Sequence, residues 1–173
     1  MTDKERFKSD LLELGVNPGD VVLVHSSMKA LETECTPEEI IDILEEVLGE
    51  EGTLLMPAPT YENVTAEQPI FDSAATEPCI GLLPRVFLNR PGVERSVHPT
   101  HSVCAKGKMA HRLTVGHSMD DVAVGPHSPF MLLPLYRGKL LFIGDILHSC
   151  TFLHGIETIV RPPYIRWNSE PQP

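Results

Sequence analysis

A histidine and a glutamate near the C-terminal end of the chain have a spacing that suits acid–base chemistry. His154 and Glu157 lie in a stretch, residues 149–157, that we expect to begin a helix. Residues i and i+3 share one face of a helix, so the carboxylate can orient the imidazole and stabilise its cation. Because histidine accepts a proton near neutral pH, the pair could act as a general base. The alternative is an ordinary surface ion pair.

Cys150 offers a rival chemistry, because it precedes His154 by about one helical turn. A helix N-terminus lowers the pKa of a thiol and favours the nucleophilic thiolate. The alternative is a buried free cysteine that acts as a small apolar residue.

A cluster of polar residues, His25, Ser26 and Ser27, follows an apolar run at residues 21–24 and precedes Lys29. Hydroxyls and free backbone N–H groups at a strand end suit a phosphate or pyrophosphate. The glycines of a P-loop are missing, so this is not that motif. The alternative is a serine-rich turn without a ligand.

A second polar cluster spans residues 95–102, between two expected strands. Arg95, Ser96 and Thr100 could bind a phosphate or a carbonyl group. His98 and His101 could be zinc ligands, or one of them could be a satisfied turn or core residue. The sequence leaves these alternatives open.

The elements that must position these residues follow from apolar periodicity and capping signals. A Thr36-Pro37-Glu38-Glu39 capping box begins a helix between two buried strands, which indicates a right-handed parallel crossover and an α/β core. We expect helices at residues 4–14, 37–48, 80–89 and 150–160, strands at 21–24, 52–57, 94–97, 102–105 and 139–144, and loops at 58–78 and 117–129.

Length and composition restrict the class of protein. A chain of 173 residues fits one domain, which we place at residues 1–161, followed by a frayed tail at 162–173. The net charge of -10 disfavours a nucleic acid partner and suits a polycationic small molecule. The alternative is an acidic surface that mainly keeps the protein in solution. We expect no membrane span, signal peptide or metal site. The four cysteines are scattered along the chain, which favours a reduced, cytoplasmic setting.

A series of short motifs runs along the chain from about residue 11 to residue 157. They are Leu14-Gly15-Val16, Val24-His25-Ser26-Ser27, Gly52-Thr53-Leu54-Leu55-Met56-Pro57, Phe71-Asp72 with Thr76, Gly92-Val93-Glu94-Arg95-Ser96-Val97-His98-Pro99-Thr100-His101-Ser102, Gly125-Pro126-His127-Ser128-Pro129-Phe130 and Thr151-Phe152-Leu153-His154-Gly155-Ile156-Glu157. Together, and in this order, these motifs resemble the aminoglycoside 3-N-acetyltransferase family.

The resemblance implies a family-specific acetyltransferase fold, with a central, mostly parallel or mixed sheet and flanking helices. It implies transfer of an acetyl group from acetyl-CoA to an amine of the 2-deoxystreptamine ring, an activity that confers antibiotic resistance. It assigns roles to ten residues: His154 as the base with Glu157 beside it, His25, Ser26, Ser27, Arg95, Ser96 and Thr100 at the cofactor, and Glu62 and Asp72 at the cationic sugar. Thr100 is also a candidate donor to the oxyanion.

The chain departs from the family in length, because family members continue well past residue 173. We therefore expect a C-terminally shortened domain, which could self-associate as a homo-oligomer. An inactive, CoA-binding relative is the alternative function. A third hypothesis is a metal-dependent hydrolase that uses His98, His101, His154 and Glu157.

Overall fold

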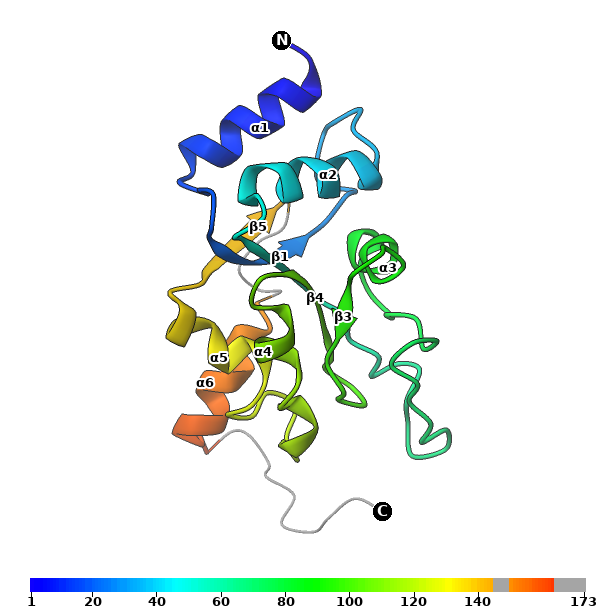
Figure 1. The fold of residues 1–173 in the computed structure, drawn as a ribbon. Helices are drawn as coiled ribbons and strands as arrows, with labels where there is room; N and C mark the ends of the chain where they lie inside the picture. The colour runs from blue at the N-terminus through cyan, green and yellow to red at the C-terminus, as the bar shows by residue number, and fades with distance from the viewer. Residues whose placement is uncertain (145–149, 164–173) are drawn as a thin grey trace.

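A five-stranded mixed sheet forms the centre of the computed structural model, which describes residues 1–144 and 150–163 (Figure 1). The strand order is β3-β4-β2-β1-β5. The strands are β1 Val21–Ser26, β2 Thr53–Pro57, β3 Glu94–Arg95, β4 Val103–Gly107 and β5 Lys139–Ile143. The helices are α1 Asp3–Glu13, α2 Pro37–Leu48, α3 Leu82–Leu88, α4 Ala110–Thr114, α5 Pro129–Leu132 and α6 Phe152–Val160, with 3-10 turns η1 His117–Met119 and η2 Leu133–Tyr136.

The central strand β1 pairs in parallel with both β2 and β5, whereas β4 runs antiparallel to β2 and β3. This arrangement confirms the expected α/β class with a mixed sheet and parallel first and second strands. Because β1, β2 and β5 are parallel, their carboxyl ends lie on one edge of the sheet. That edge is where open α/β sheets bind ligands.

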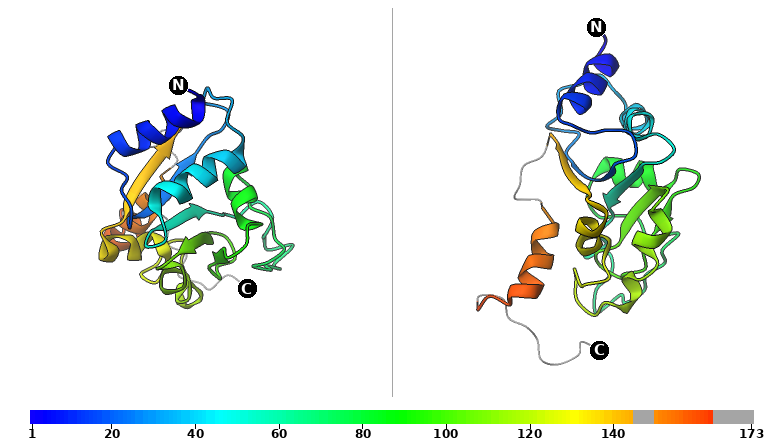
Figure 2. Two further views of the ribbon diagram at one scale, coloured as in Figure 1. Left: turned by 45° about the horizontal axis from the view of Figure 1, so that its top comes forward. Right: turned by 60° about the vertical axis from the view of Figure 1, so that its left-hand side comes forward.

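Both faces of the sheet are buried at its central strands β1 and β2, because adjacent residues point in opposite directions and nearly all of them are buried. Val22 and Val24 belong to the apolar cluster under α1, α2 and α3. Val21 and Leu23 belong to a second cluster with residues of α4, α5 and η2. Figure 2 shows α1 and α2 on one side of the sheet and α4, α5 and α6 on the other.

The capping box at Thr36 is confirmed as the start of α2. Its Oγ1 accepts a hydrogen bond from the Glu39 N–H at 3.3 Å, and the Glu39 carboxylate accepts one from the Thr36 N–H at 2.9 Å. Pro37 follows at the first helical position, where its missing N–H costs nothing. This helix therefore begins where its local sequence dictates.

Helix α6 approaches α5 closely at Gly155. A Cβ atom on Gly155 would lie 3.0 Å from Val124 Cγ1 and would overlap the Met131 side chain. A larger residue would have to displace the Met131 side chain or shift the helix that carries His154. The glycine therefore permits close packing of α6 against Met131 of α5.

Several boundaries differ from the expected ones. The strand expected at 94–97 ends at Arg95, because the chain turns at Pro99 after the Ser96 N–H bonds the Val103 carbonyl. Helix α4 was not predicted, because five residues carry too little periodicity and its stability comes from burial of Ala110 and Leu113. Residues 145–149 and most of the expected tail, 164–173, lie outside the described residues. Within the described part, no helix has the length and apolarity to cross a membrane.

Candidate active site at the carboxyl edge of the sheet

A pocket of about 300 Å³ opens at the carboxyl ends of β1 and β2. The sequence-predicted residues His25, Ser26 and Ser27 line it, and His25 stacks on Phe142 of β5 with ring centroids 5.1 Å apart. Its other lining residues are Val24, Pro57, Ile80, Gly81, Pro84 and Thr151. Apolar walls with a few hydroxyl groups suit a flexible arm of methylene and amide groups.

The acid–base pair expected on α6 is present. His154 Nδ1 lies 2.8 Å from Glu157 Oε2, and 57% of the His154 side chain is exposed. A carboxylate only accepts hydrogen bonds, so Nδ1 carries the proton of the neutral imidazole and Nε2 holds the free lone pair. This is the tautomer that a general base requires.

Thr151 connects the pocket to this pair. It lines the pocket, and its carbonyl accepts a hydrogen bond from the His154 N–H at 3.1 Å. Residues three apart on a helical turn lie on the same side, about 4.5 Å apart along the axis. The candidate base is therefore one turn from the rim of the pocket.

His98 is a structural residue of the 98–101 turn. Its Nδ1 accepts the backbone N–H groups of Thr100 and His101 at 3.2 and 3.0 Å. The ring proton is therefore on Nε2, which donates to the Val122 carbonyl at 3.2 Å. Both nitrogens are occupied, so this ring has no lone pair for a metal, and the alternative of a satisfied turn histidine is confirmed.

The 98–101 turn brings further imidazole rings together. His117 stacks on His98 with centroids 4.7 Å apart, and His101 lies 6.4 Å from the ring of His154. Burial lowers the pKa of His98, lowers that of His101 to about 4 and lowers that of His117 to about 3, with smaller contributions from neighbouring histidines for the last two. These rings are therefore uncharged at neutral pH.

Arg95 links the loop before α3 to the sheet through hydrogen bonds. Its guanidinium donates to the carbonyls of Thr76 at 2.5 Å and Ala58 at 3.0 Å, and it lies 5.1 Å above the ring of Phe71. Its Nε donates to Ser102 Oγ at 2.9 Å. The side chain thus organises the loop, and contact with a cofactor stays a prediction.

The two hydroxyl residues expected at the cofactor, Ser96 and Thr100, occupy different environments. Ser96 is buried, and its Oγ accepts the Val103 N–H at 2.8 Å and contacts His117 Nδ1 at 2.8 Å. Thr100 is half-buried, with Oγ1 2.8 Å from His101 Nδ1. Their assignment to the cofactor also stays a prediction.

The expected substrate residues Glu62 and Asp72 are exposed on the loop between β2 and α3. Asp72 Oδ1 accepts the N–H groups of Ala74 and Ala75 at 2.8 and 3.2 Å, which orders the turn. Tyr61, next to Glu62, lies 5.8 Å from the ring of His101. The start of this acidic loop therefore reaches the turn beside the candidate base.

Cys150, the candidate nucleophile, is a buried free thiol. The residue is 5% exposed, and Cys35, Cys79 and Cys104 are free thiols as well. The burial of Cys150 matches the alternative of a small core residue.

Among residues 1–144 and 150–163, no group of three or more His, Cys, Asp or Glu side chains has an arrangement that could hold a metal ion.

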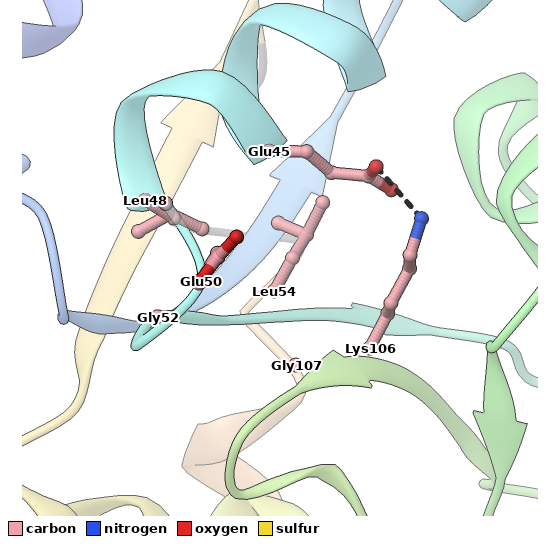
Figure 3. Close-up of a pocket in the computed structure, with 8 residues that line it drawn as sticks. Glu45, Leu48, Glu50, Gly52, Leu54, Lys106 and Gly107 are labelled. Carbon is pink, nitrogen blue, oxygen red and sulfur yellow. Dashed lines mark hydrogen bonds and ion pairs between the residues drawn. The ribbon is translucent and has the colours of Figure 1, made fainter.

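A second pocket of about 320 Å³ opens at the other end of β2 (Figure 3). Glu45 and Lys106 lie at its wall, joined by an ion pair of 2.8 Å. None of the sequence-predicted site residues lines it. It is therefore separate from the candidate active site.

Comparison with known proteins identifies the family. Residues 23–173 match the sequence profile of the aminoglycoside 3-N-acetyltransferases. The chain belongs to the aminoglycoside 3-N-acetyltransferase family. It is 35% identical to aminoglycoside N(3)-acetyltransferase VII of Streptomyces paromomycinus, over 98% of this chain and 65% of that one. It is also 35% identical to aminoglycoside N(3)-acetyltransferase III of Serratia marcescens, over 94% of this chain and 66% of the relative.

Solved structures of the family have the same fold. AAC-IIIb in a binary complex with CoASH has a TM-score of 0.77 at 27% identity, covering 92% of this chain and 65% of its own. AAC-VIa bound to sisomicin has a TM-score of 0.80 at 29% identity, covering 90% and 64%. The chain thus spans slightly less than two thirds of the length of these family members.

The sequence reasoning missed three residues of this region: Tyr61, His117 and Thr151. Tyr61 stands in an irregular loop, so no periodicity connects it with His101. His117 is isolated in the sequence, and only the fold stacks it on His98. Thr151 could have been noticed as the residue one turn before His154.

Proposed function

We propose that this protein transfers an acetyl group from acetyl-CoA to an amine of an aminoglycoside, at the 3-amino group of the 2-deoxystreptamine ring, with His154 as the general base. The observation that carries the proposal is the placement of the His154–Glu157 pair one helical turn from Thr151 at the rim of the pocket. Family membership and the CoASH and sisomicin complexes of AAC-IIIb and AAC-VIa support the choice of substrates.

The pocket at the carboxyl edge is the proposed site for the pantetheine arm of acetyl-CoA. His25, Ser26 and Ser27 would hold its polar groups, and the apolar walls would exclude water from its methylenes. Arg95, Ser96 and Thr100 are the further residues assigned to this cosubstrate. Acetyl-CoA supplies the thioester carbon that the acceptor amine attacks.

In the proposed reaction, His154 and Glu157 handle the proton that the acceptor amine loses. An ammonium has no lone pair, so the amine must lose a proton before or while the C–N bond forms. His154 Nε2 accepts that proton, and Glu157 stabilises the resulting imidazolium through the 2.8 Å contact with Nδ1. The C–S bond then breaks, the departing thiolate of CoA takes the proton held by His154, and the second proton of the original ammonium passes to solvent. A positioned base typically contributes about 100- to 10,000-fold to the rate.

The acidic loop supplies the proposed contact with the acceptor. Glu62 and Asp72 are exposed carboxylates, and Tyr61 anchors the start of the loop beside His101. An aminoglycoside carries several ammonium groups, which these carboxylates would attract.

The test is the release of free thiol from acetyl-CoA in the presence of sisomicin. We expect activity in the wild-type protein and a loss of about 100-fold or more in His154→Ala. His111→Ala is the matched control, because His111 also pairs with a carboxylate, Glu94 at 3.0 Å, but is 74% exposed and outside the site. Turnover of His154→Ala within twofold of the wild type would remove His154 from the mechanism.

Calorimetry with CoA separates this function from the alternative of a CoA-binding protein without activity. Measurable affinity for CoA with no acetyl transfer to any aminoglycoside tested would favour that alternative. Absence of CoA binding would contradict both.

A further inference from the structure

The ring of His101 contacts three other rings, those of His154, Tyr61 and His98. Its ring is edge-on to His154, with centroids 6.4 Å apart and an interplanar angle of 83°. The ring of Tyr61 lies 5.8 Å away from that of His101. His101 therefore connects the acidic loop, through Tyr61, to the candidate base.

Hydrogen bonds fix His101 at both its backbone and its ring. Its N–H donates to His98 Nδ1 at 3.0 Å, and its own Nδ1 lies 2.8 Å from Thr100 Oγ1. The Thr100 carbonyl in turn accepts the Thr60 N–H at 2.9 Å, which joins the turn to the loop that carries Tyr61. A ring held by this many contacts can serve as a rigid wall.

The ring of His101 is also uncharged at neutral pH. Burial lowers the pKa of His101 to about 4, and the charges of His98 and His154 lower it further in the same direction. Among the described residues, His101 and Glu157 are the titratable groups in ring or hydrogen-bond contact with His154. The base therefore faces one carboxylate and one neutral ring.

We propose that His101 is a positioning residue for His154: its neutral ring packs edge-on against the imidazole, keeps Nδ1 on Glu157 and leaves Nε2 toward the acceptor amine. The catalytic consequence rests on the proposed function. A neutral wall is required because His154 becomes a cation when it accepts the proton, and a second cation beside it would oppose that step.

Three substitutions at His101 distinguish the effect of its ring shape on catalysis from the effect of its charge. His101→Ala removes the wall and should lower kcat about 10-fold with little change in KM, since an interaction that orients the base acts in the transition state. His101→Phe keeps a neutral ring and should restore most of kcat. His101→Lys places a cation beside the base and should move the acid limb of the pH–kcat profile to lower pH by about 0.5 to 1 unit.

Nitrogen-15 NMR of the His154 ring tests the geometry without catalysis, with the signal assigned from the spectrum of His154→Ala. We expect one predominant Nδ1–H tautomer in the wild type and in His101→Phe, and mixed tautomers in His101→Ala. Thermal melts verify that each variant is folded. Wild-type kcat together with an unchanged His154 tautomer in folded His101→Ala would overturn the inference.

The two proposals fail in different ways. If the wild type transfers no acetyl group but His101→Ala disturbs the His154 tautomer, the function is wrong and the positioning role stands. If the wild type is active and all His101 variants match it in kcat, pH profile and tautomer, the function stands and the positioning role is wrong.

Discussion

The Nδ1 atom of His98 accepts the backbone N–H of His101 at 3.0 Å, and this bond shapes the turn that presents His101 to the candidate base. The same nitrogen accepts the Thr100 N–H at 3.2 Å. A side chain that caps its own turn in this way replaces two backbone acceptors that the irregular chain cannot provide. The turn therefore depends on a histidine that does no chemistry of its own.

Replacing His98 should lower stability. His98→Ala leaves two backbone N–H groups and the Val122 carbonyl without this partner, and we expect a loss of about 1–3 kcal/mol in the free energy of unfolding. His98→Asn should lose less, because asparagine also accepts N–H groups two and three residues ahead. Urea denaturation measures both. Equal stability of His98→Ala and the wild type would contradict the capping role.

Glu157 should matter for rate more than for stability. Glu157→Gln keeps a hydrogen-bonding side chain beside His154 but removes the charge that stabilises the imidazolium, so we expect kcat to fall about 10-fold or more. Thr158→Val is the control, since Thr158 bonds the His154 carbonyl rather than its ring. Steady-state kinetics with acetyl-CoA and sisomicin provides the measurement. A similar fall in both variants would point to a general disturbance of α6.

Gly155 should be intolerant of a side chain. Gly155→Ala introduces a Cβ into the space of Met131 and against Val124, and we expect a loss of about 1–3 kcal/mol together with reduced activity. Met131→Ala opens that space, so the double variant should recover stability. A double-mutant cycle in urea measures the coupling. Additive effects would show that the two residues do not meet.

Acid should destabilise the fold through the buried imidazoles. The folded-state pKa of His117 is about 3 and that of His101 about 4, whereas the unfolded chain binds these protons near pH 6.5. The unfolded state therefore binds more protons in this window, and stability falls as the pH drops from about 6.5 toward 4, by on the order of a few kcal/mol. Unfolding free energies measured between pH 7.5 and about 4.5 test this.

Two substitutions test whether His117 causes this loss of stability in acid. His117→Gln should flatten the dependence of stability on pH, because it removes the most strongly shifted of these groups. His111→Gln, at an exposed position, should leave the slope as it is in the wild type. If the wild type, His117→Gln and His111→Gln show the same dependence of unfolding free energy on pH, His117 contributes nothing to that dependence.

Arg95 should hold the acidic loop in place. Arg95→Lys loses the forked contacts to the carbonyls of Thr76 and Ala58, so the loop between β2 and α3 should be cut faster by protease. We expect about a 10-fold faster cleavage, with the sites mapped by mass spectrometry. If instead only the KM for acetyl-CoA rises, the sequence-derived assignment of Arg95 to the cofactor is the better account.

Local sequence determined the elements and the family. Apolar periodicity and the Thr36 capping box predicted α2 and its neighbouring strands, because helix starts and buried strands are encoded by nearby residues. The spacing of His154 and Glu157 predicted their contact for the same reason, since residues three apart on one helix must lie on one face. The order of the motifs along the chain was by itself enough to indicate the family.

Tertiary structure decided which of the polar residues meet. Tyr61, His101 and His154 come from a loop, a turn and a helix, and nothing in their spacing predicts that their rings lie side by side. The neutrality of His101 and His117 likewise comes from burial, which depends on side chains supplied by other segments. Contacts between distant segments are set by packing of the whole sheet and its helices, so the surroundings of the base became visible only in the folded chain.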